Sequence, residues 1–144
     1  EDVSSEIRTP EIAYYASRVS AVPEVREFLL NTQRDMAKNG NILMDGRDIG
    51  TVILPDAPVK IFLTASAESR AERRYKELAE KGQQVTMESV LHDINERDRQ
   101  DMNRAIAPLR QAEDAVLLDT SALTLEESIA SVLRIIREKT EENK

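Results

Sequence analysis

Three short apolar runs, interrupted only by Lys60, constrain the fold of this chain most strongly, because each is bounded by turn residues and too short to form a helix. They cover residues 42–44, 59–63 and 115–118. Runs of this kind predict strands that are buried on both faces of a parallel sheet. We therefore expect an α/β domain in which helices connect the strands by right-handed crossovers.

Helical patterns fill the sequence around these runs. Two helices with a break near Val22 are expected across about 10–38, and Asn39–Gly40 is a typical C-terminal stop. Further helices are expected at about 67–81, 87–103 and 125–139, with start signals at Thr9, Ser66, Thr86 and the capping box that begins at Thr124. Three strands make a small sheet for this architecture, which suggests that the sheet is incomplete.

The composition excludes several classes of protein. The 144 residues include no Cys, which argues against disulfide scaffolds and cysteine metal sites. No apolar run approaches the roughly 18 to 20 residues of a membrane helix, and the acidic start is not a targeting signal, so we expect a cytoplasmic protein with no membrane partner. The net charge of -7 argues against nucleic-acid binding. The 20 basic residues divide into 14 Arg and 6 Lys, which favours local binding of a small anion.

One arginine–aspartate group lies at helical spacing. Arg97, Asp101 and Arg104 occur in and just after the stretch 95–101, which has no apolar residue. A helix would place all three on one face, where two guanidinium groups can hold an anion and the carboxylate can accept from a sugar hydroxyl. Spacing alone leaves open the alternative of an exposed ion pair with little effect on stability.

A second group follows the first predicted strand. In open α/β sheets ligands bind at the carboxyl ends of strands, which is where the segment 45–51 would lie. Gly46 and Gly50 would let the backbone approach a ligand, and Arg47 and Asp48 would face the crevice. The alternative is an ordinary turn with a self-compensating ion pair between Arg47 and Asp48.

Other polar residues give weaker signals. Arg70, Arg73 and Arg74 alternate with glutamates, a pattern typical of a solvated helix face. His92 is the only histidine and has no nucleophile or nitrogen ligand beside it, so we expect a structural or surface role. Zinc-type spacing, a Gly-x-Ser-x-Gly motif and a phosphate-loop pattern do not occur, although a complete nucleotide phosphotransferase needs a glycine-rich loop with a Lys.

Three stretches carry a family resemblance. They are 2–4 with 6–9; 45–51 continuing through 55–63; and 97–98 with 101, 103–105 and 107–109. In order and without large gaps, they resemble the bacterial cytidylate kinases, which transfer the terminal phosphoryl group of ATP to CMP or dCMP. The resemblance continues through 114–119 and the last helix. It implies a three-layer parallel-sheet fold of the phosphate-loop nucleoside monophosphate kinases, here incomplete because the central N-terminal strand and the phosphate loop are absent.

The resemblance also implies roles for ten residues. The cytosine base is recognised by Ser17, Arg26 and Asp48; Arg97 and Asp101 lie near the pentose; Arg47 and Arg104 clamp phosphate and act in catalysis; and Arg70 with Arg73 or Arg74 meets ATP at a mobile lid. The lid itself is implied at roughly 74–87. Mg²⁺ would be bound together with ATP, by ligands that lie largely outside this chain.

The same resemblance divides the single domain into parts. Residues of about 1–38 form the helical monophosphate-binding side, 39–73 and 105–144 form the core, and 74–104 form the lid and the CMP-contacting helix. The absent strand would lie between the two runs near 42–45 and 59–63, and its absence would leave a gap of roughly 10 Å that a stable fold does not leave open.

The resemblance leaves alternatives for the chain itself. The N-terminal segment is either another piece of the protein or missing altogether, and a chain that stands alone is expected to be inactive because nothing in it replaces the loop amides and the Lys. Two rival hypotheses are a non-catalytic interaction fragment and a kinase for a different nucleoside monophosphate.

Overall fold

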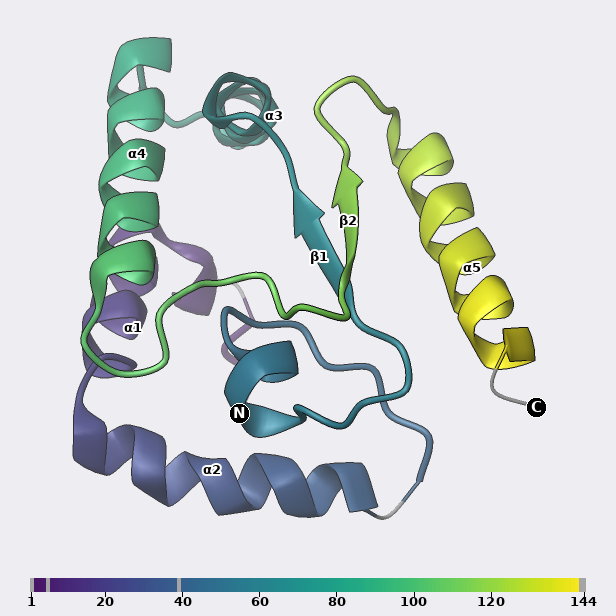
Figure 1. Ribbon diagram of the computed structural model, residues 1–144. Coiled ribbons are helices and arrows are strands. Elements are labelled where there is room, and N and C mark those ends of the chain that lie inside the picture. The colour runs from purple at the N-terminus through teal and green to yellow at the C-terminus, as the bar shows by residue number, and fades with distance from the viewer. Residues whose placement is uncertain (1, 5, 39, 143–144) are drawn as a thin grey trace.

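Two parallel strands form the only sheet in the residues described by the computed structural model, which are 2–4, 6–38 and 40–142. They are β1 (Ile61–Thr64) and β2 (Val116–Asp119), and Ile61 lies opposite Val116 in the register. Both strands begin and end one or two residues later than the sequence predicts. The α/β class is confirmed, because helices connect and flank a small parallel sheet (Figure 1).

The helices lie close to their predicted positions. They are η1 (Glu6–Arg8), α1 (Pro10–Val19), α2 (Pro23–Lys38), η2 (Ile49–Ile53), α3 (Ala67–Glu80), α4 (Met87–Asn103) and α5 (Leu125–Glu142). The predicted start signals are confirmed, since the side chains of Thr9, Ser66 and Thr86 each accept a backbone hydrogen bond from the first turn of their helix. The stop predicted at Asn39–Gly40 includes Asn39, which lies outside the described residues.

The core of the described residues lies mainly between α3 and α4. Ala71 and Leu78 of α3 and Val90 of α4 are buried together, and Leu91 and Ile94 of α4 pack against them. Figure 1 shows α3 end-on beside β1, α4 along one side of the molecule and α5 beside β2 on the other. None of the helices in this part of the chain has the combination of length and apolar character that a membrane crossing needs.

The strand predicted at 42–44 is wrong. Residues 41–45 form neither helix nor strand, and Leu43 is 85% exposed. A strand needs a neighbour that pairs with its backbone groups, and no described strand lies beside this segment. An apolar run indicates a tendency to be buried, but it cannot reveal whether a pairing partner is present.

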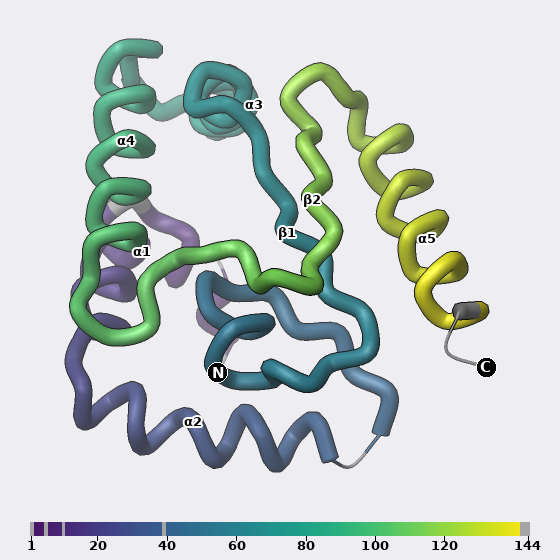
Figure 2. Tube along the Cα trace, in the orientation of Figure 1, coloured from purple at the N-terminus to yellow at the C-terminus, as the bar shows by residue number. Residues whose placement is uncertain are grey.

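A groove separates this irregular segment from β1. Its volume is about 620 Å³, and it is lined by 44–47 on one side and by all of β1 on the other. Figure 2 traces the chain from the end of α2 back toward the middle of the molecule, where this segment begins the loop that leads to η2. Leu63 of β1 is 60% exposed, so an apolar strand side chain remains uncovered near the groove.

Candidate functional site

Asp48 lies at the centre of a buried charged cluster. Arg26 of α2 donates from Nη2 to Asp48 Oδ2 and from Nη1 to the carbonyl oxygen of Ser20 at 3.1 Å. Arg104, the residue after α4, places Nη2 3.4 Å from Asp48 Oδ1. Asp48 is only 6% exposed. We call Arg26, Asp48 and Arg104 the Asp48 centre; it brings together residues that are distant in the sequence.

Arg104 retains an unused donor inside this centre. Its Nη2 is buried and has no hydrogen-bond partner among the described residues, while its Nε donates to the carbonyl oxygen of Ala107 at 2.5 Å. Burial, and then the charge of Arg26, lower the pKa of the Arg104 guanidinium from its ordinary value. A buried donor without a partner is costly, and a ligand oxygen would supply the missing acceptor.

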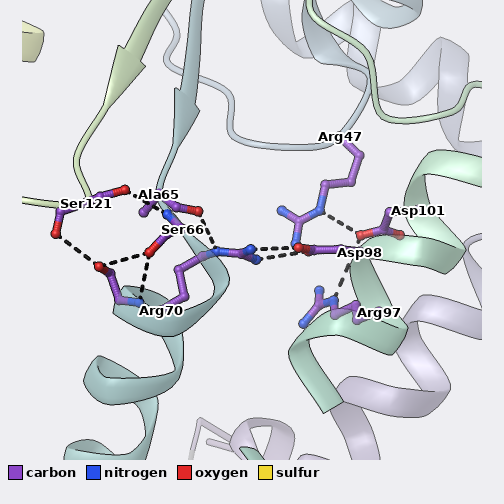
Figure 3. Close-up of polar contacts among 9 residues, drawn as sticks. Arg47, Ala65, Ser66, Arg70, Arg97, Asp98, Asp101 and Ser121 are labelled. Carbon is purple, nitrogen blue, oxygen red and sulfur yellow. Dashed lines mark hydrogen bonds and ion pairs between the residues drawn. The ribbon is translucent and has the colours of Figure 1, made fainter. Parts of the chain in front are cut away.

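The neighbouring side chains of Arg47 and Asp48 contact different helices. Arg47 donates from Nε to Asp101 Oδ2 of α4 at 2.9 Å, whereas Asp48 pairs with Arg26 of α2. The alternative of a self-compensating Arg47–Asp48 turn is therefore wrong. Arg97 lies 4.0 Å from the same Asp101 oxygen, and Figure 3 shows Arg47 and Arg97 on either side of that carboxylate.

The helix carrying Asp101 ends before the last member of the predicted group. Because α4 ends at Asn103, Arg104 lies in extended backbone just beyond it, not on the helix face that the spacing predicted. Its side chain contacts Asp48 instead of extending the Arg97–Asp101 row. The simple exposed ion pair is also incorrect for Asp101, because this residue is buried and shared between two arginines.

A pocket of about 500 Å³ lies against the Asp48 centre. Its lining includes both charged residues and apolar side chains from α2 and η2, namely Arg26, Leu29, Leu30, Arg47, Asp48, Val52, Ile53 and Arg104. This volume is typical of a small-molecule site. Its charged lining consists of three arginines, at 26, 47 and 104, and three acidic residues, Glu27, Asp45 and Asp48, so the formal charge of the lining is zero in a chain of net charge -7.

A half-exposed ion pair lies beside the groove next to β1. Arg70 of α3 donates from Nη1 and Nη2 to the two carboxylate oxygens of Asp98 of α4, at 2.9 and 2.6 Å. Its Nε donates to the carbonyl oxygen of Ala65 at 3.0 Å (Figure 3). The hydrogen bonds to Asp98 raise the pKa of Arg70. This Arg70–Asp98 pair joins α3 to α4, so Arg70 is not part of a purely solvated face.

The remaining predicted residues fall into two sets. Arg73 lines the groove with Arg70, and it donates to the carbonyl oxygen of Thr120 at 2.5 Å, at the end of β2. Arg74 instead pairs with Glu77 on its own helix at 2.8 Å and does not line the groove. Ser17 of α1 does not line the 500 Å³ pocket, whereas Ser20 does.

Two residues that the sequence interpretation missed contribute to this arrangement. Asp98 holds Arg70, and its position three residues before Asp101 on α4 was a usable signal. Arg34 of α2 donates to the carbonyl oxygens of η2, and nothing in the sequence pattern indicates that contact.

The described residues do not form a site for the magnesium ion that the resemblance implies. In that part of the chain no three His, Cys, Asp or Glu side chains lie close enough together to hold a metal ion. The aspartates at 48, 98 and 101 are each occupied by arginines. We therefore derive no step through Mg²⁺ from these side chains.

Comparisons with known proteins identify close relatives. A family profile described as cytidylate kinase matches residues 1–138. The chain is 56% identical over 137 residues to the cytidylate kinase of Thermosipho melanesiensis, covering 95% of this chain and 63% of the relative. It is 51% identical over 140 residues to that of Carboxydothermus hydrogenoformans (97% and 63%), and 54% identical over 139 residues to that of Enterobacter sp. (96% and 61%). The chain thus spans somewhat less than two thirds of the length of these relatives.

Proposed function

Because this chain belongs to the cytidylate kinase family, we propose that it supplies the CMP- or dCMP-binding side of an enzyme that transfers the terminal phosphoryl group of ATP. The observation that carries this proposal is the Asp48 centre, where a buried carboxylate lies between two arginines at the wall of a pocket. Proteins that catalyse phosphoryl transfer act mainly by positioning phosphates and neutralising their charge. Arg47 and Arg104, which line the pocket, suit both tasks.

The base is recognised by Asp48 and Arg26. The carboxylate accepts from the exocyclic amine of cytosine, and the guanidinium donates to the ring nitrogen or the carbonyl. Uracil has a carbonyl where cytosine has the amine, so UMP would place two acceptors against each other in a buried site. The family resemblance assigns Ser17 of α1 to the base as a third polar group, although Ser17 does not line the pocket.

The sugar and phosphate lie nearer α4. Asp101 accepts from a sugar hydroxyl, with Arg97 beside it at 4.0 Å. Arg104 offers its buried Nη2, which makes no hydrogen bond among the described residues, to a phosphate oxygen. Arg47 uses its Nε to bind Asp101, which leaves its two terminal nitrogens for the same phosphate. These two arginines would act in catalysis by holding the accepting phosphate and neutralising its charge.

ATP binds at the groove that lies between residues 44–47 and β1. Arg70 and Arg73 line it, and Arg74 begins the segment of about 74–87 that forms the lid. A phosphate loop, its Lys and the strand leading into it come from residues outside this chain, and the strand occupies the groove against β1. Mg²⁺ would bind with the ATP phosphates, and closure of the lid would exclude water from the reaction. This chain alone is then inactive.

Calorimetric titration tests the proposal. CMP, dCMP, UMP and AMP are titrated into this chain, and into the chain extended by the segment that precedes the matched region in the Thermosipho melanesiensis relative. We expect both proteins to prefer CMP or dCMP, and only the extended protein to form CDP or dCDP from ATP. Equal or absent responses to all four nucleotides in both proteins would contradict the proposal.

Two other outcomes identify the rival functions. A preference of the extended protein for UMP or AMP would indicate a kinase for a different nucleoside monophosphate. Selective CMP binding without any phosphoryl transfer in the extended protein would indicate a non-catalytic binding fragment.

A further inference from the structure

Arg34 of α2 uses its guanidinium to hold two backbone carbonyl groups. Its Nη2 donates to the carbonyl oxygen of Val52 at 2.9 Å, and its Nε donates to that of Ile53 at 3.1 Å. These carbonyls belong to the last two residues of η2, the turn that begins directly after Asp48. The planar fork of an arginine can reach both oxygens at once, which the single ammonium group of a lysine cannot do in the same way.

One peptide group connects Arg34 to Asp48. In the peptide between Val52 and Ile53, the carbonyl accepts from Arg34, and the N–H donates to the carbonyl oxygen of Asp48 at 3.2 Å. The amide of Val52 donates to the same Asp48 oxygen at 2.9 Å. Since a peptide group is planar and rigid, fixing its oxygen also fixes the direction of its N–H. Arg34 thereby restrains the backbone of Asp48.

Helix α2 consequently holds Asp48 at two points. Arg26 binds its carboxylate, and Arg34 restrains its backbone through η2. Ile53 is 4% exposed and Asp48 is 6% exposed, so the connection is buried from η2 to Asp48, and Arg34 is partly buried. Figure 1 shows the turn of η2 lying over α2, the helix that carries both arginines.

We propose that Arg34 is a positioning residue that sets the selectivity for cytosine by fixing the position of the Asp48 carboxylate. This inference rests on the proposed function, in which Asp48 contacts the base. Discrimination between an amine and a carbonyl depends on the geometry of the hydrogen bond. The bond weakens steeply when donor and acceptor are misaligned. A carboxylate that can move by a fraction of an ångström avoids the repulsion from the uracil carbonyl, either by turning away or by admitting a water molecule between them. The preference for CMP over UMP then falls.

Substitution of Arg34 tests this inference with two readouts. Arg34→Met removes both donors, Arg34→Lys keeps the charge with a single donor group, and Arg134→Met on the exposed face of α5 is the matched control. The first readout is hydrogen exchange at the amides of Ile53 and Leu54 in the chain without ligand. We expect it to rise about tenfold or more in Arg34→Met, less in Arg34→Lys and not in the control.

The second readout is the ratio of CMP to UMP affinity by calorimetry. We expect Arg34→Met to weaken CMP binding about tenfold with little change for UMP, and Arg34→Lys to be intermediate. A merely structural role would lower both affinities equally. The inference is overturned if exchange at Ile53 and Leu54 is unchanged, or if exchange rises while the affinity ratio is retained.

The two proposals can fail separately. An unsubstituted chain that binds CMP and UMP equally overturns the proposed function, whereas the exchange comparison still decides whether Arg34 restrains the backbone of Asp48. If Arg34→Met does not fold, the same comparisons in Arg34→Lys decide the inference, because that variant keeps the charge and most of the side-chain volume.

Discussion

The Asp48 centre and the Arg70–Asp98 pair consist of the same types of side chain, arginine and aspartate, in different surroundings. In the Asp48 centre, the side chains of Asp48 and Arg104 are 8% and 9% exposed. In the Arg70–Asp98 pair, the side chains of Asp98 and Arg70 are 27% and 36% exposed. A charge removed from water depends on its partners, whereas a hydrated charge keeps water as an alternative partner. The first arrangement therefore fixes the geometry of a site, and the second can separate when a ligand or a motion requires it.

The largest effect is expected from removing the charge of the buried carboxylate. Asp48→Asn leaves two arginines close together without a counter-charge, and we expect the free energy of unfolding to fall by about 3 kcal/mol. Urea denaturation followed by circular dichroism measures this loss. The matched control is Asp56→Asn in an exposed loop, for which a change within about 0.5 kcal/mol is expected. Similar losses in the two variants would show that the buried charge of Asp48 contributes no more to stability than an exposed one.

The Arg70–Asp98 pair should contribute far less to stability. A double-mutant cycle with Arg70→Gln and Asp98→Asn is expected to give a coupling free energy of about 0.5 to 1 kcal/mol, because water competes for both groups. The coupling should decrease in high salt, which screens exposed charges. A coupling as large as the effect of Asp48→Asn, or one that salt does not change, would remove the distinction between the two regions.

The fold could be predicted from the sequence wherever short-range interactions decide it. Thr9, Ser66 and Thr86 begin helices because their hydroxyls accept hydrogen bonds within the next three residues, which is a property of the local sequence. The apolar run at 42–44 led to a wrong prediction, since strand formation depends on a partner strand, and no described strand pairs with this segment. Local pattern carries no information about that partner.

Residue spacing alone predicted the residue types of the candidate site but not their partners, whereas the family resemblance also grouped Arg26 with Asp48. The sequence placed Arg47 and Asp48 in one loop and suggested that they could pair with each other, whereas they bind α4 and α2 respectively. Residues 46–48 form a bend, and the helices that the two side chains reach are placed by contacts between distant parts of the chain, which adjacency in the sequence does not reveal. Arg34 was missed for a related reason: its partners are backbone carbonyls, and a backbone carbonyl has no signature in the sequence.

The smallest effect is expected at an ion pair that is exposed on a single helix. On α3, hydrogen bonds from Lys81 and then Arg74 lower the pKa of Glu77 from its ordinary value of 4.5 to about 2. A lowered carboxyl pKa stabilises the folded protein above the ordinary value, and this stabilisation is lost as the pH falls through the folded value. Because the side chain is 45% exposed, we expect Glu77→Gln to lower the free energy of unfolding by only about 0.3 to 0.5 kcal/mol at neutral pH.

This pH dependence separates Glu77 from the other acidic residues of α3. The difference between Glu77→Gln and the unsubstituted chain should shrink when urea denaturation is repeated at stepwise lower pH from 4.5 toward 2, since the native carboxylate becomes protonated there. Glu80→Gln on the same exposed helix end is the control and should show little difference at any pH, because Glu80 has no ion pair within the described chain. A pH-independent effect of Glu77→Gln would mean that helix propensity, not the charge of Glu77, is responsible.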